Sequence, residues 1–240
     1  MKWSNRKVTR AARNPPVDPV ITKKLFCERI ANAVAEYRVP RSLVINCDQT
    51  GVCLTTSSSY TMAPLRGARQ VNGEGKDDKR GITMLLASTI NGRLLPPQVI
   101  YTGTTERCHP HYSFPEDWNI TQTPSHWSNT ESMHEYLQEV IIPYVQSIRA
   151  KKGFDEDHKA ILILDTYRAH TEECFQTAMA DAHIHYIYVP PGSTADLQPL
   201  DVEGSVNMAI KRRITNEYNT YQDDLVLKAM ESAGGEPIPG

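Results

Sequence analysis

The stretch LVINCD, residues 43–48, decides the fold. It is a short, mostly apolar run of the length of a buried strand, with an acid at its end. The stretch AILILD, residues 160–165, repeats this pattern. A carboxylate at the end of a buried strand loses hydration unless it is paired, hydrogen-bonded or bound to a cation. The two stretches therefore predict strands of one sheet whose acids, Asp48 and Asp165, project into a shared mouth at its edge.

Three further runs of strand length complete the predicted sheet, at residues 82–90, 94–101 and 184–189. Asn91-Gly92 separates the first two and is a strong hairpin signal, so the first half is predicted as an antiparallel meander. Apolar residues at helical spacing predict helices near residues 18–40, 128–148, 171–182 and 201–221. This order of strands and helices predicts an α/β sandwich.

Local signals set the ends of these helices. Asp18-Pro19 is typical of a helix start, residues 128–131 (SNTE) fit a capping box, and Pro143 predicts a kink. Together with the charge pattern, they divide the chain into a basic flexible arm at 1–17, a leading helix at 18–40, one domain at 41–222 and a C-terminal tail at 223–240.

The composition is that of a soluble globular protein. Among 240 residues, 26 Lys and Arg face 28 Asp and Glu, and 40% are hydrophobic. No apolar run approaches the roughly 20 residues that a bilayer span needs, so no membrane partner is expected. The five cysteines show no paired spacing, which predicts free thiols rather than disulfides.

A third acid, Asp201, ends the stretch LQPLD at residues 197–201, near the start of the last predicted helix. Each acid alone could be a turn former or a helix cap. Three converging carboxylates would repel one another, and the usual solution is a hard divalent cation such as Mg²⁺ or Mn²⁺. Two such ions serve phosphodiester chemistry, which makes Asp48, Asp165 and Asp201 the candidate catalytic and metal-binding residues.

Residues 44–51 (VINCDQTG), 162–170 (LILDTYRAH) and 189–201 (VPPGSTADLQPLD) resemble, in order, the three acidic motifs of the DDE superfamily endonucleases. The resemblance is to the pogo, Jerky and centromere-protein-B-like transposases and covers about residues 40–220. It implies a ribonuclease-H-like α/β fold, with a mixed five-stranded sheet flanked by helices. It places Asp48 on the first strand, Asp165 at the end of the fourth and Asp201 on the final helix.

The resemblance also implies a catalytic triad of these acids with two Mg²⁺ or Mn²⁺ ions, DNA as substrate, a homodimer and a nuclear location. The chain departs from the family pattern at three places. Gln49 replaces a common Glu, and Thr166-Tyr167 replaces the Asn or Gly that commonly follows the second acid. In addition, the 40 residues before the first motif are too few for the usual helix-turn-helix DNA-binding region, as in a truncated relic or a fragment.

Basic side chains near the second strand and on the last helix are candidates for holding a phosphate backbone, with a solvated face as the alternative. They are Arg66, Arg69, Lys76, Lys79, Arg80, Lys211 and Arg212. His170, five positions after Asp165, is an auxiliary candidate that could orient a phosphate or a water, or cap a helix. The stretch CHPH at 108–111 lacks the second ligand pair of a zinc site.

Two functions follow from these observations. The first is a metal-dependent transposase or endonuclease that cleaves a DNA phosphodiester and joins the freed 3′-hydroxyl to target DNA. The second is a catalytically inactive, transposase-derived DNA-binding protein. The three acids favour the first, whereas the missing DNA-recognition region favours the second.

Overall fold

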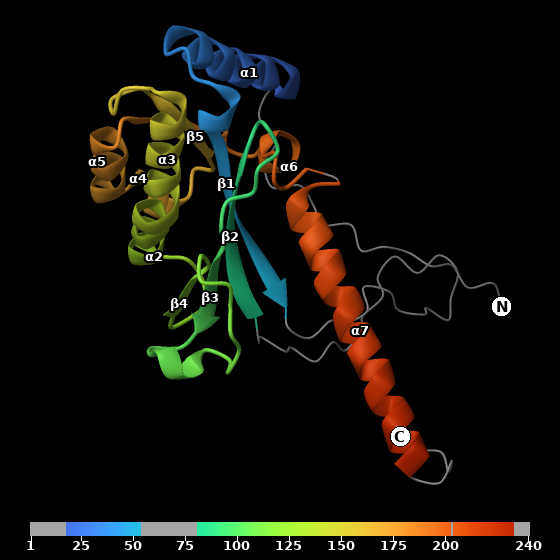
Figure 1. The fold of residues 1–240 in the computed structure, drawn as a ribbon. Coiled ribbons are helices and arrows are strands. Elements are labelled where there is room, and N and C mark those ends of the chain that lie inside the picture. The colour runs from blue at the N-terminus through green and yellow to red at the C-terminus, as the bar shows by residue number, and fades with distance from the viewer. Residues whose placement is uncertain (1–17, 54–80, 203, 233–240) are drawn as a thin grey trace, which may run out of the picture. The chain divides into compact units, whose positions relative to one another are not determined.

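The computed structural model describes residues 18–53, 81–202 and 204–232. The chain forms two compact units. Among the described residues, the larger unit contains residues 18–52 and 81–208 except 203, and the smaller contains Cys53 and residues 209–232. Figure 1 shows the elements of both. The predicted basic arm at 1–17 and the end of the predicted tail, 233–240, lie outside the described residues.

One sheet forms the centre of the larger unit, with strand order β4-β3-β2-β1-β5-β6. The strands are β1 (Val44–Cys53), β2 (Gly81–Thr89), β3 (Gln98–Thr102), β4 (Asn119–Thr123), β5 (Ala160–Leu164) and β6 (Ile184–Tyr188). The prediction of five strands was wrong by one, because β4 was missed. Its sequence, NITQT, is mostly polar and lacks the apolar alternation that predicts a strand. Among the described strands, β4 pairs with β3 alone, at the edge of the sheet.

The sheet is mixed, as expected. The central strand β1 runs parallel to β5, with Val44 opposite Ile161 and Asn46 opposite Ile163, and β5 runs parallel to β6. Strands β2 and β3 are antiparallel, and a turn at Asn91-Gly92 joins them, so the predicted hairpin is confirmed. The expected meander ends there, because β4 is parallel to β3.

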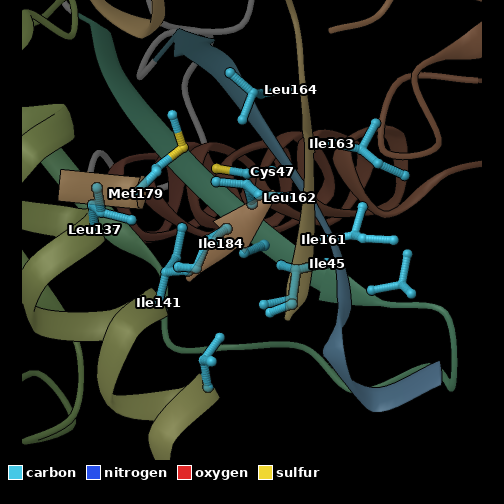
Figure 2. Close-up of a cluster of buried hydrophobic side chains, with 14 of the residues drawn as sticks. Ile45, Cys47, Leu137, Ile141, Ile161, Leu162, Ile163, Leu164, Met179 and Ile184 are labelled. Atoms are coloured by element: carbon cyan, nitrogen blue, oxygen red, sulfur yellow. The ribbon is translucent and has the colours of Figure 1, made fainter. Parts of the chain in front are cut away.

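Helices bury one face of the sheet. They are α2 (Thr130–Tyr136), the π-helical turn η3 (Leu137–Ile141), α3 (Ile142–Lys152) and α5 (Glu173–Asp181). Figure 2 shows Cys47 and Leu162 of the central strands beside Leu137 and Met179 of these helices. Because side chains alternate along a strand, Asn46 and Asp48 lie on the other face of β1. The same face also carries buried apolar side chains, Val44 of β1 and Ile161 and Ile163 of β5.

One predicted detail of the long helix needs correction. The N-cap is Asn129 rather than Ser128, and its side chain accepts a hydrogen bond from the Ser132 N–H at 2.9 Å. A π-helical turn, rather than regular α-helix, directly precedes α3. Pro143 follows it as the second residue of α3, and the kink predicted there stays a prediction.

The remaining elements connect these layers. They are α1 (Pro19–Glu36), the 3₁₀ turns η1 (Arg41–Leu43) and η2 (Glu106–Cys108), α4 (Arg168–Thr171), α6 (Thr194–Leu197) and α7 (Val206–Ser232). The Asp18 side chain accepts the Val20 and Ile21 N–H groups, which confirms the predicted start of α1. In contrast, α7 begins later than the predicted Asp201 and continues beyond residue 222, where the sequence placed the domain boundary.

All five cysteines fall within the described residues and are free thiols, as predicted. Among the described helices, none is both long enough and apolar enough to cross a bilayer.

Candidate active site

The first two acids lie side by side at the carboxyl ends of the central parallel strands. Since Asn46 is opposite Ile163, the same register places Asp48 level with Asp165, one residue beyond the end of β5. Residues at equal levels of parallel neighbours point to the same face of a sheet. Asp48 is 4% exposed and Asp165 is partly exposed. The two acids therefore lie on one face of the sheet, and the shared mouth between them stays a prediction.

The third acid is linked to Asp48 through an asparagine that the sequence analysis did not identify. Asn207, in the first turn of α7, donates from Nδ2 to Asp48 Oδ2 at 2.7 Å and to Asp201 Oδ1 at 2.9 Å. One amide thus joins a carboxylate of the central strand to a carboxylate that is distant in sequence. Asn207 is 2% exposed, whereas Asp201 is exposed.

Asp201 does not lie on the final helix as predicted, but in the turn between α6 and α7. Two local features delay the helix start. Gly204 has a φ of 80°, which interrupts helical backbone, and the Ser205 hydroxyl lies 3.5 Å from the Met208 N–H at the capping position. The turn is fixed to the helix by the Asn207 N–H, which donates to the Leu200 carbonyl at 3.3 Å.

Gln198, within the same LQPLD stretch, anchors this turn to the sheet. Its Nε2 donates to the Cys47 carbonyl at 2.9 Å, and its Oε1 accepts from Asn46 Nδ2 at 2.8 Å. Asn46 Nδ2 also lies 3.2 Å from the Ile163 carbonyl of β5. Both side chains are buried, so the network holds the segment bearing Asp201 against the two strands that bear the other acids.

Crowding of negative charge is visible in the electrostatics of Asp48. Burial, followed by the charge of Asp201 and that of Asp165, raises the pKa of Asp48 from 3.8 to about 7, against the lowering effect of hydrogen bonds from Gln198 and the Gln49 backbone. A bound cation would offset this crowding.

His170 orients the second acid. Its Nδ1 lies 3.0 Å from Asp165 Oδ1 and 2.9 Å from the Asp165 carbonyl oxygen. The ring is 1% exposed, and the Tyr188 hydroxyl donates to the His170 carbonyl at 2.6 Å. These contacts hold His170 against Asp165, whereas its predicted role toward a phosphate or a water stays a prediction.

The donor set suits a hard divalent cation, because carboxylate oxygens are the ligands that Mg²⁺ and Mn²⁺ prefer. Within the described ranges, no three His, Cys, Asp or Glu side chains stand close enough together to form a ready metal-binding group. The candidate ligands are Asp48 and Asp201, whose carboxylates accept hydrogen bonds from the same nitrogen, Asn207 Nδ2. Asp165, which lies level with Asp48 on the neighbouring strand, is the third candidate.

The predicted DNA-contacting side chains divide into two sets. Arg66, Arg69, Lys76, Lys79 and Arg80 lie outside the described residues. Lys211 and Arg212 are exposed on α7, within the smaller unit. Their role remains a prediction. His109 of the CHPH stretch packs against Tyr101, with ring centroids 5.6 Å apart.

Solved structures establish the class of this fold. The chain is similar to a chain of a pre-cleavage Mos1 transpososome, with a TM-score of 0.53 and 11% identity over 91% of this chain and 59% of that one. A Mos1 mariner paired end complex with Mn gives a TM-score of 0.50 and 12% identity, over 92% and 58% of the two chains. The mixed sheet flanked by helices is a ribonuclease-H-like α/β fold.

Sequence comparison identifies the family. The DDE superfamily endonuclease profile matches residues 79–232, and the chain belongs to this family. It is 29% identical to the Mus musculus protein "Pogo transposable element with KRAB domain" over 159 residues, 65% of this chain and 24% of that protein. It is 26% identical to the Mus musculus "Jerky protein" over 205 residues, 82% of this chain and 34% of that protein. The chain thus spans about a quarter to a third of the length of these relatives.

Proposed function

We propose that this chain is the catalytic domain of a DDE-type transposase, which cleaves DNA phosphodiesters and transfers the freed 3′ end to target DNA. The observation that carries the proposal is the Asp48–Asn207–Asp201 bridge with Asp165 on the neighbouring strand. Acids held this near one another are costly for the protein alone, and carboxylate oxygens are the ligands that a hard divalent cation prefers.

In this proposal, Asp48, Asp165 and Asp201 hold two Mg²⁺ or Mn²⁺ ions. When bound, the ions supply an activated water or 3′-hydroxyl and stabilise the leaving oxygen. Gln198 holds the turn that carries Asp201 against the sheet, and His170 orients Asp165. Asp48 is shielded from water on a rigid central strand, so its carboxylate is held in place before the substrate binds.

DNA binding, a homodimer and a nuclear location belong to the same proposal. The similarity to proteins named for the pogo transposable element and Jerky supports it, as does the Mos1-like fold. Lys211 and Arg212, exposed on α7, are proposed to contact the phosphate backbone.

Cleavage of a labelled DNA duplex in Mn²⁺ tests the proposal. Wild type is expected to nick the duplex, and Asp165→Asn is expected to lose nicking because the amide is nearly isosteric but uncharged. Asp155→Asn is the matched control. Asp155 is exposed and precedes β5, whereas Asp165 follows it, so the control makes the same change at the opposite end of one strand.

Two outcomes would contradict the proposal. One is equal nicking by wild type and Asp165→Asn. The other is a folded wild-type protein that binds DNA without nicking it, which would support the inactive DNA-binding protein instead.

A further inference from the structure

Asn207 occupies an unusual position for a buried amide. Its two N–H groups face two carboxylates, while its Oδ1 is buried with no hydrogen-bond partner among the described residues. The opposite orientation of the amide would place Oδ1 against carboxylate oxygens, which repel it. The amide orientation is therefore set by the acids, although it leaves a buried carbonyl oxygen unsatisfied, and that costs free energy.

The chemistry of the alternatives explains why an amide suits this position. A Lys or Arg would neutralise the acids and compete with a cation, and an Asp would add a further negative charge. An apolar side chain would fill the space but would leave Asp48 and Asp201 repelling each other. Only a neutral double donor can approach both carboxylates and preserve their charge for a cation.

The local backbone holds Asn207 firmly. Its own N–H donates to the Leu200 carbonyl, directly before Asp201, and the Ser205 hydroxyl lies at the start of the same helix. Asp48 belongs to β1, so the amide fixes the separation of two acids that no short stretch of backbone connects.

We infer that Asn207 is a positioning residue for the divalent-cation site, holding Asp48 and Asp201 at the spacing that cation binding requires. The inference rests on the proposed function. Asn207 engages Oδ2 of Asp48 and Oδ1 of Asp201, so the second oxygen of each carboxylate is outside these two bonds. A cation would therefore compete for Asp48 with the hydrogen bonds from Gln198 and the Gln49 backbone, but not with those from Asn207.

Calorimetric titration of Mn²⁺ into the 240-residue protein without DNA tests the inference. Asn207→Ala is expected to weaken Mn²⁺ binding by about 10- to 100-fold, the usual effect of removing a residue that orients metal ligands. The control is Asn119→Ala. Asn119 Nδ2 also bridges two carboxylates, Glu135 and Glu139, away from the three acids, and its loss is expected to leave the Mn²⁺ affinity within about twofold of wild type.

A kinetic measurement separates positioning from a merely structural role. In the nicking assay, Asn207→Ala is expected to lower kcat at fixed Mn²⁺, to leave KM for DNA unchanged and to regain activity as Mn²⁺ is raised. If Asn207→Ala does not fold, Asn207→Ser replaces it, because a hydroxyl retains one donor.

The outcomes distinguish a failure of the role inferred for Asn207 from a failure of the proposed function. Wild type that binds Mn²⁺ together with an Asn207 variant of equal affinity would overturn the inference alone. Wild-type protein that is folded but binds no Mn²⁺ would overturn the proposed function and the inference with it.

Discussion

Two pairs of acids in this protein each share the amide of one asparagine, and the two pairs differ in how complete their networks are. Asn119 Nδ2 donates to Glu135 at 2.9 Å and to Glu139 at 2.6 Å, and its Oδ1 accepts from Gln98 at 2.7 Å. Asn207 bridges Asp48 and Asp201 in the same way, but its Oδ1 is buried without a partner among the residues described.

This difference between the two networks indicates which pair of acids has only a structural role. Glu135 and Glu139 lie four positions apart along one helical segment, and Glu139 is exposed, so water screens their charges. Asp48 is buried and is joined to Asp201 from a distant part of the chain, so its charge is poorly screened. The first network satisfies both ends of the Asn119 amide, although the Oε1 of Gln98 within it is buried without a partner among the described residues, whereas the second retains repulsion that a cation could relieve.

The largest expected effect is on the rate of DNA nicking, which should depend on the Asp pair and not on the Glu pair. Asp48→Asn should reduce DNA nicking in Mn²⁺ by at least about a thousandfold, because a charged ligand of the proposed cation site is lost. Glu135→Gln makes the corresponding change in the other pair and should leave the rate within about twofold. Initial rates of duplex nicking measure both. Similar losses in the two variants would mean that the Asp pair has no special role.

An added charge is the next largest change. Asn207→Asp replaces the bridging donor by a buried carboxylate between Asp48 and Asp201, so it should lower the free energy of unfolding in EDTA at pH 8 by about 3–5 kcal/mol. Asn119→Asp should cost less, about 1–2 kcal/mol, because Glu139 is exposed. Urea unfolding followed by circular dichroism measures both. Equal losses of unfolding free energy in the two variants would mean that the two sites do not differ in how strongly burial penalises an added charge.

Removing the charge of Asp48 should raise the free energy of unfolding of the metal-free protein, rather than lower it. The pKa of Asp48 is raised above its unfolded value, so the folded state favours the protonated form and loses stability as pH rises from 3.8 through about 7. Asp48→Asn should therefore stabilise the metal-free protein at pH 8 by about 1–3 kcal/mol, a gain that disappears below about pH 4.

Thermal melts in EDTA across this pH range measure the effect, and Mn²⁺ should reverse the order of the two melting temperatures. A variant less stable than wild type at pH 8 in EDTA would show that Asp48 is held by favourable contacts rather than crowded.

The sequence predicts the acids of this site but not the amides that arrange them. Strand-length apolar runs ending in Asp48 and Asp165 were sufficient to predict two strands of one sheet, because buried strands leave short apolar runs, whereas the parallel pairing of these strands came from the structure. Asn46, Gln198 and Asn207 act through contacts between residues distant in the chain, and such contacts leave no periodic signal. The polar Asn46 within an otherwise apolar run was the only local hint.

The same reasoning explains the errors at the edge of the sheet and at the last helix. Strand β4 is held by pairing with β3 rather than by burying alternate apolar residues, so its polar sequence predicts no strand. The start of α7 depends on Gly204 and Ser205, two residues that stop and cap a helix, although apolar spacing extends across them.

The smallest expected effect is that of a substitution at Glu139, the exposed member of the Glu pair. Glu139→Gln removes one charge from the Glu pair, which relieves a like-charge contact at four-residue spacing but weakens a charge-assisted hydrogen bond from Asn119. Because Glu139 is exposed, these opposing effects should nearly cancel, leaving the free energy of unfolding within about 0.5 kcal/mol and the Mn²⁺ affinity unchanged. Urea unfolding and Mn²⁺ titration check this. A loss above about 2 kcal/mol, or Mn²⁺ binding weakened tenfold, would mean that the Glu135–Asn119–Glu139 network is coupled to the site that contains Asp48.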